Sequence, residues 1–131
     1  MAVITKNGKP TLSTAVPPTT SSLSSLLAGE AIAQGDACYW KASDGKVYRS
    51  NGTAANEAAI VDGFALEDCP AGEYLSLYWN VNLNYGTGLT PGLVYLAATA
   101  GALDTAATTG GTVSIGRILP DGKRIWLRKS Y

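Results

Sequence analysis

The sequence predicts an all-β protein, a compact small β-barrel or sandwich with an extended N-terminal arm. Turn signals built from Gly, Pro, Asn and Asp recur about every ten residues along the chain. Short runs of β-branched and aromatic residues lie between these turns, and no run shows the 3.6-residue period of a long amphipathic helix. The length of 131 residues is that of one domain. These features favour a barrel or sandwich and exclude an α/β fold.

The first 25 residues differ in composition from the rest of the chain. Residues 11–25 are mainly Thr, Ser and Pro and follow no regular period. Such a segment cannot by itself bury enough apolar surface to offset the entropy that it loses on ordering. Residues 1–25 are therefore either a disordered tail or an arm that becomes ordered on a neighbouring subunit. The arm's candidate contact residues are Val3, Ile4, Leu12 and Val16.

The β domain is predicted to comprise residues 26–131, with a brief strand or turn at 24–29 at its start. The following strands are predicted, in chain order, at 37–42, 46–49, 60–66, 73–83, 93–97, 112–119 and 124–128. Asp44-Gly45 and Asp121-Gly122 mark hairpin turns, because Gly accepts the positive φ that a tight turn requires. An Ala-rich stretch at 53–59 is predicted to form one helical turn.

The segment 73–83 alternates in polarity along its length, which is typical of a strand with one buried face. Its aliphatic face is expected to lie on the core, and its outer face carries Tyr78. The last strand alternates in the same way, with Trp126 between Arg124 and Arg128. Exposed Tyr and Trp side chains suit a contact with protein or sugar. Tyr78 and Trp126 are therefore candidate contact residues, unless the second sheet of the barrel or sandwich covers them.

The residue types present argue against an enzyme and against a bound cofactor or metal. His is absent, which removes the commonest general base and a common metal ligand. Cys38 and Cys69 form no CxxC pair and are expected to be free and buried. The acidic residues mostly lie in turns, where carboxylates accept hydrogen bonds from backbone N–H groups. Asp62 and Glu67-Asp68 could bind Ca²⁺ together with loop carbonyls, but a solvated loop is the favoured interpretation.

Acidic and basic residues are equal in number, at ten each, but they are unevenly distributed. Residues 1–29 carry two Lys and no acid, residues 30–116 carry nine acids and three bases, and residues 117–131 carry five bases against Asp121. This pattern is either ordinary surface charge or a basis for head-to-tail pairing, between copies or with another protein. The basic cluster is too small to predict nucleic-acid binding. No apolar run reaches the ~20 residues that span a bilayer, and residues 1–6 lack the features of a secretory signal.

Six short blocks occur in an order and spacing that resemble the bacteriophage capsid decoration (cement) proteins, which are small β-rich head proteins of the DUF2190 type. The blocks are Ala28-Gly-Glu-Ala-Ile-Ala-Gln-Gly-Asp-Ala37, Asp44-Gly-Lys-Val-Tyr48, Val61-Asp-Gly-Phe-Ala65, Ala71-Gly-Glu73, Gly88-Leu-Thr-Pro-Gly-Leu-Val-Tyr-Leu96 and Val113-Ser-Ile-Gly-Arg117. The resemblance extends over residues 28–127, about three quarters of the chain.

This resemblance implies a β-tulip-like domain that forms a homotrimer on the outer surface of the phage head. Such a protein is made in the host cytoplasm, joins the virion, and stabilises contacts between subunits of the major capsid protein. Members of the family often reach the capsid with an N-terminal extension, which residues 1–25 match in character. The resemblance implies no catalysis, no cofactor, and no nucleic-acid or membrane partner. The alternative is a receptor- or carbohydrate-binding phage fibre domain, which would use Tyr78, Trp79 or Trp126.

Overall fold

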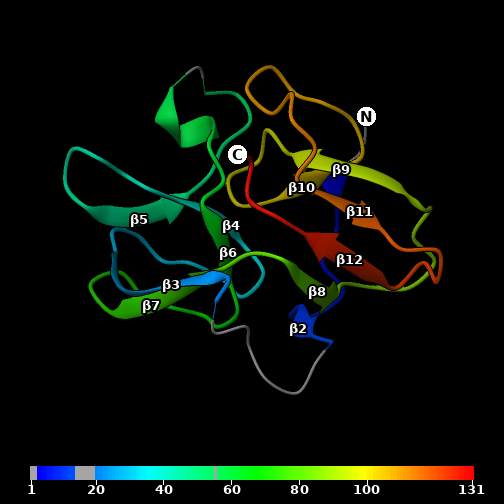
Figure 1. Cartoon of the computed structure of the whole chain (residues 1–131), viewed down its shortest axis with the longest axis horizontal. Helices are drawn as coiled ribbons and strands as arrows, with labels where there is room; N and C mark the ends of the chain where they lie inside the picture. The colour runs from blue at the N-terminus through cyan, green and yellow to red at the C-terminus, as the bar shows by residue number, and fades with distance from the viewer. Residues whose placement is uncertain (1–2, 14–19, 55) are drawn as a thin grey trace.

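The structure, a computed structural model, describes residues 3–13, 20–54 and 56–131. These residues form twelve β-strands, one 3-10 turn and no α-helix. The strands make two lobes, a closed five-stranded barrel and a curled seven-stranded sheet (Figure 1). The prediction of a compact all-β fold is therefore confirmed. Among the residues described, no helix has the length and apolar character needed to cross a membrane.

The barrel is built from residues 22–78. Its strands, in spatial order, are β3 (Ser22–Ala28), β5 (Lys46–Arg49), β4 (Ala37–Trp40), β6 (Gly63–Ala65) and β7 (Tyr74–Tyr78), and β7 pairs with β3 to close it. The β4–β5 hairpin turns at the predicted Asp44-Gly45, where Gly45 has a φ of 69°. A Cβ on Gly63 would lie 2.9 Å from the Cβ of Leu77, so a glycine is needed where β6 and β7 approach each other.

The curled sheet combines the N-terminal residues with strands from residues 81–127. Its strands, in spatial order, are β1 (Val3–Ile4), β10 (Leu103–Asp104), β9 (Gly92–Leu96), β11 (Gly116–Ile118), β12 (Arg124–Leu127), β8 (Val81–Asn84) and β2 (Thr11–Leu12). All neighbouring strands pair antiparallel. The β11–β12 hairpin turns at the predicted Asp121-Gly122. A 3-10 turn at Glu57–Ala59 takes the place of the helical turn predicted within 53–59.

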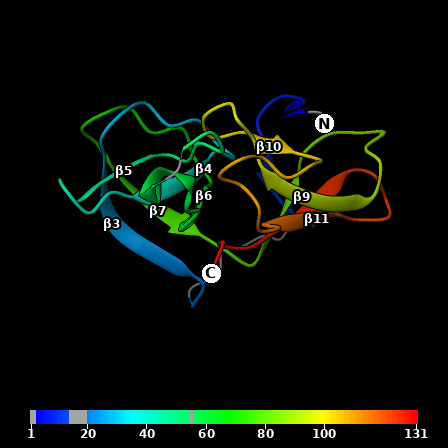
Figure 2. The same cartoon turned by 90° about the horizontal axis from the view of Figure 1, so that it is seen from above.

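The main hydrophobic core lies between the two lobes. One side of the curled sheet supplies buried residues from β8, β9, β10, β11 and β12, and Ala37, Val61 and Phe64 from the barrel segment are buried against them. A second cluster fills the barrel itself around Val47 and Leu77. The two lobes lie side by side in both views (Figures 1 and 2), and only one side of the curled sheet contributes to the core that they share.

Residues 3–13 pack against their own chain, in a region predicted to be an arm. β1 pairs with β10 at one edge of the curled sheet, and β2 pairs with β8 at the other edge. The segment therefore spans both edges of the sheet, and Ile4 is buried in the main core. The physical reason is that edge strands carry unpaired backbone groups, which the N-terminal residues satisfy. The predicted boundary between residues 25 and 26 also falls inside β3.

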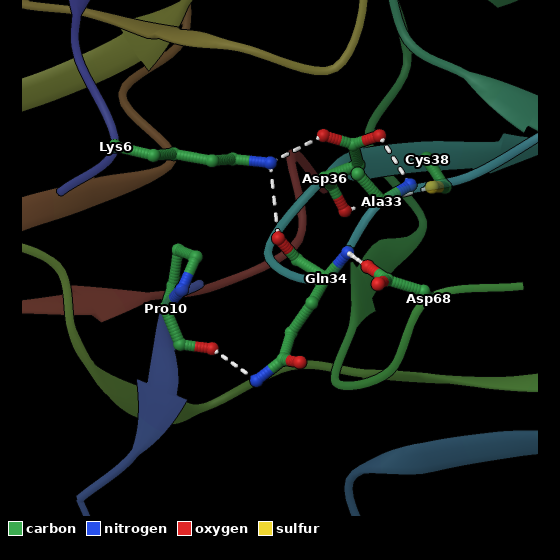
Figure 3. A network of polar contacts seen from close by, with 7 residues as sticks. All are labelled: Lys6, Pro10, Ala33, Gln34, Asp36, Cys38 and Asp68. Carbon is green, nitrogen blue, oxygen red and sulfur yellow. Dashed lines mark hydrogen bonds and ion pairs between the residues drawn. The ribbon is translucent and has the colours of Figure 1, made fainter. Parts of the chain in front are cut away.

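Polar contacts attach this N-terminal segment to the loop before β4 (Figure 3). Lys6 Nζ donates to Asp36 Oδ1 at 2.6 Å and to the carbonyl oxygen of Gln34 at 3.0 Å. Gln34 Nε2 donates to the carbonyl oxygen of Pro10 at 2.6 Å. Lys9 pairs with Asp68, whose Oδ1 accepts the backbone N–H of Gln34 at 2.8 Å. The N-terminal segment thus joins the two lobes as well as the two sheet edges.

The segment 73–83, predicted as one strand, is divided into β7 and β8. The break lies at Asn80, which has a φ of 57°, in the left-handed region that a short polar Asn tolerates. β7 belongs to the barrel and β8 to the curled sheet, so the chain passes between lobes at this point. The alternation continues across the break: Leu77 and Val81 are buried, and Tyr74 is exposed.

Candidate functional site: two protein-contact surfaces on opposite lobes

A row of side chains crosses the outer side of the curled sheet. Arg117 on β11 is paired with Leu93 on β9 and with Trp126 on β12, and Trp126 is paired with Asn82 on β8. The alternate residues of these strands, including Ile118 and Ile125, point into the core. Side chains opposite each other in an antiparallel pair are close neighbours. Leu93, Arg117 and Trp126 therefore form one continuous patch.

Two apolar side chains of this patch are open to solvent. Leu93 is 54% exposed and Trp126 is 37% exposed. A shallow hollow of about 470 Å³ lies over the patch, lined in part by Asn82, Ser114 and Arg128. Leu93, Arg117, Trp126 and Arg128 are called the arginine–tryptophan face below. An exposed aromatic among arginines has the composition of a protein-contact centre.

The charges of the arginine–tryptophan face are largely uncompensated. The side chain of Arg117 has no hydrogen bond or ion pair within the described part of the chain, and Arg128 Nε donates only to the carbonyl oxygen of Ser114, at 3.2 Å. Arg124, at the edge of the face, differs because its Nε lies 2.7 Å from Asp121 Oδ2. The backbone N–H of Lys123, with Arg124, lowers the pKa of Asp121 to about 2. Asp121 thus stays ionised, and its carboxylate stabilises the hairpin turn by accepting the backbone N–H groups of Lys123 and Arg124.

A second surface lies on the barrel. It surrounds an open hollow of about 420 Å³ whose lining includes Leu66, Glu67, Tyr74 and Tyr78. Tyr74 is 73% exposed. The carboxylates of Glu67, which lines the hollow, and of Glu73, which precedes Tyr74 in the chain, are exposed and have no partner among the residues described. Glu67, Glu73, Tyr74 and Tyr78 are called the acidic tyrosine surface below.

The two lobes carry opposite net charge. Residues 20–79, which hold the barrel, contain eight acids and three bases, a formal charge of −5. Residues 3–13 and 80–131 contain two acids and seven bases, a formal charge of +5. Two ion pairs cross between the lobes, Lys6 with Asp36 and Lys9 with Asp68. An excess of three charges of opposite sign therefore remains on each lobe.

The predicted contact residues lie in different environments. Trp126 is in the centre of the arginine–tryptophan face, and Val3 is exposed on the edge strand β1. Tyr78 is half-buried; it lines the barrel hollow and also packs against the main core. Of the two N-terminal residues, Ile4 is buried in the main core and Leu12 packs against it. Val16, the sixth candidate, lies outside the described residues.

Sequence reasoning did not find Leu93 or Arg117 as contact residues. Arg117 alternates with buried neighbours, so its exposure could have been inferred. Its position beside Trp126 depends on the register of β11 against β12, which a single sequence does not reveal.

The remaining polar groups have structural roles. No group of three or more His, Cys, Asp or Glu side chains within the described residues could hold a metal ion. Cys38 and Cys69 are free and buried, as predicted, and burial raises the pKa of both thiols. Of the predicted Ca²⁺ ligands, Asp62 accepts the backbone N–H of Trp40 at 2.8 Å.

No family model, no curated protein and no solved structure matches this chain.

Proposed function

We propose that this protein is a structural capsid decoration protein of a bacteriophage. It binds the outer surface of the head and stabilises contacts between subunits of the major capsid protein, as a homotrimer. The sequence blocks between residues 28 and 127 support the class of protein. The observation that carries the proposal is the arginine–tryptophan face, an open protein-contact surface on a sheet, with a second and chemically different surface on the other lobe.

A clamp between neighbouring proteins requires surfaces that can contact two partners at once. The arginine–tryptophan face is on the outer side of the curled sheet, and the acidic tyrosine surface is on the barrel. Trp and Arg side chains often supply most of the binding energy at the centre of an interface. Strands hold such side chains in place more rigidly than loops do. These features suit a protein that links its neighbours.

The proposal is tested by binding to phage heads. Expanded heads of the parent phage that lack the protein are mixed with it and sedimented. The wild-type protein is expected to sediment with the heads to a saturating, stoichiometric level. Trp126→Ala is expected to weaken the affinity for heads by about thirtyfold or more, since loss of a central interface Trp typically costs about 2 kcal/mol or more.

Trp40→Ala is the matched control for this experiment. Trp40 is 47% exposed on the β4–β5 hairpin and lies on neither contact surface. Its variant should bind heads as the wild type does. A wild-type protein that does not bind heads at any concentration would contradict the proposal. Binding to a glycan array without head binding would favour the fibre-domain alternative. Of the side chains that this alternative would use, Trp79 is half-buried and its ring is covered by Lys129, whose Nζ lies 4.5 Å from the ring centre.

A further inference from the structure

The two contact surfaces are complementary to each other. The arginine–tryptophan face offers the guanidinium groups of Arg117 and Arg128 around exposed apolar side chains. The acidic tyrosine surface offers the carboxylates of Glu67 and Glu73 beside an exposed Tyr74. Arginine pairs with carboxylates in a planar, bidentate geometry and also stacks on aromatic rings. Each surface therefore presents the groups that the other would bind.

One molecule cannot bring its own two surfaces together. They lie on different lobes, which stand side by side (Figures 1 and 2), and the arginine–tryptophan face is on the side of the curled sheet opposite to the side that packs with barrel residues. The excess charges of the two lobes consequently remain unpaired within a single copy. A second copy supplies both missing partners.

We propose that the arginine–tryptophan face of one copy docks on the acidic tyrosine surface of a second copy. Such a contact is head-to-tail, so each copy keeps one surface of each kind available for the next copy. Contacts of this type close into a ring when the rotation between copies permits it and otherwise form filaments. A typical interface takes about 800 Å² from each partner. A chain that exposes 6419 Å² can therefore engage both surfaces at once.

The inference rests on the proposed function, because it assigns the arginine–tryptophan face to the contact between copies of the homotrimer, and Trp126→Ala then weakens head binding by weakening that homotrimer. The contact between copies needs no head. It is therefore tested without heads, by sedimentation velocity of the full chain over a wide range of protein concentration. The wild type is expected to form oligomers whose population falls as NaCl is raised, because salt screens the charge contribution. A wild type that stays monomeric at all concentrations would contradict the inference, while leaving head binding to be judged separately.

Charge reversal on each surface provides the sharper test. Arg117→Glu alters the basic surface, and Glu67→Lys with Glu73→Lys alters the acidic surface. These side chains are exposed and make no hydrogen bond or ion pair within the described part of the chain, so the variants should fold, which near-UV circular dichroism can verify. Each variant alone is expected to associate at least about tenfold more weakly than the wild type, as reversal of a close interfacial charge does.

Mixing the two variants distinguishes a head-to-tail contact from a symmetric one. The Arg117→Glu chain keeps its acidic tyrosine surface, and the other variant keeps its arginine–tryptophan face. An equimolar mixture should therefore recover association that neither variant shows alone. Lys46→Glu, which makes the same charge change as Arg117→Glu but on the barrel strand β5, is the control and should associate as the wild type does. Unchanged association of either surface variant, or no recovery in the mixture, would overturn the inference.

Discussion

Phe64 belongs to a barrel strand, yet its side chain is fully buried in the core of the curled sheet. It therefore joins the two lobes by packing, where the N-terminal segment joins them by polar contacts. Trp126 has the opposite role, because alternation along β12 places it on the outer side of the sheet while Ile125 and Leu127 fill the core. Of these two aromatic residues, the buried one thus holds the lobes together and the exposed one forms part of a contact surface.

Phe64→Ala is expected to lower the free energy of unfolding by about 3–5 kcal/mol, the usual cost of removing a buried Phe side chain. Urea denaturation measures this loss. Tyr74→Ala is the control, because that side chain is largely exposed, and its effect should stay within about 0.5 kcal/mol. Equal losses for the two variants would show that Phe64 does not connect the lobes in the way described.

For a single residue, the sequence predicts whether the side chain is exposed better than it predicts which other side chains lie beside it. The alternation of β12 predicts that Trp126 lies apart from the core, and the structure places it there. The positions of Leu93 and Arg117 beside it could not be predicted, because they depend on the register of three strands that are distant in sequence.

The N-terminal segment is the element whose structure differs most from what its composition predicts. Residues 3–13 contain two strands of two residues each, which could not be stable in isolation. Pairing with β10 and β8 and burial of Ile4 stabilise them. The side chain of Asp36, which anchors the segment, is mostly buried and accepts from Lys6 and from the backbone N–H of Ala33.

Lys6→Met should destabilise the protein by about 1–3 kcal/mol, because it leaves the buried Asp36 carboxylate without its charged partner. Adding Asp36→Asn should cost less than the sum of the two single changes, since the pair is coupled. Lys9→Met is the matched control: its pair with Asp68 is exposed, so the loss should be about 1 kcal/mol or less. Chemical denaturation of the four variants gives the coupling energy, and additive effects would contradict the assigned role of the Lys6–Asp36 pair.

The boundaries of strands could be predicted from the sequence where a turn is determined by the residues within it. The β4–β5 and β11–β12 hairpins lie where Asp-Gly pairs predict them. The division of 73–83 could not be predicted, because alternation is unbroken across Asn80 and only the pairing partners show that β7 and β8 belong to different sheets. The short strands at the edges of the curled sheet are likewise set by their partners.

Folding separates the charges of the whole molecule more sharply than the sequence order does. The basic N-terminal and C-terminal parts of the chain lie far apart in sequence, but both contribute strands to the curled sheet. The acidic middle part forms the barrel. The uneven charge distribution, which had two interpretations at the level of sequence, thus becomes a molecule with one basic and one acidic lobe. Head-to-tail pairing needs such an arrangement.

The central claim is that this protein decorates the outside of a phage head through these surfaces. A cryo-electron microscopy reconstruction of the parent particle tests it most directly. We expect density for the barrel and the curled sheet on the outer surface of the head, where capsid subunits meet, with the arginine–tryptophan face buried in a contact. Absence of this density from the head, or its presence in a tail fibre with Trp126 open to solvent, would contradict the account.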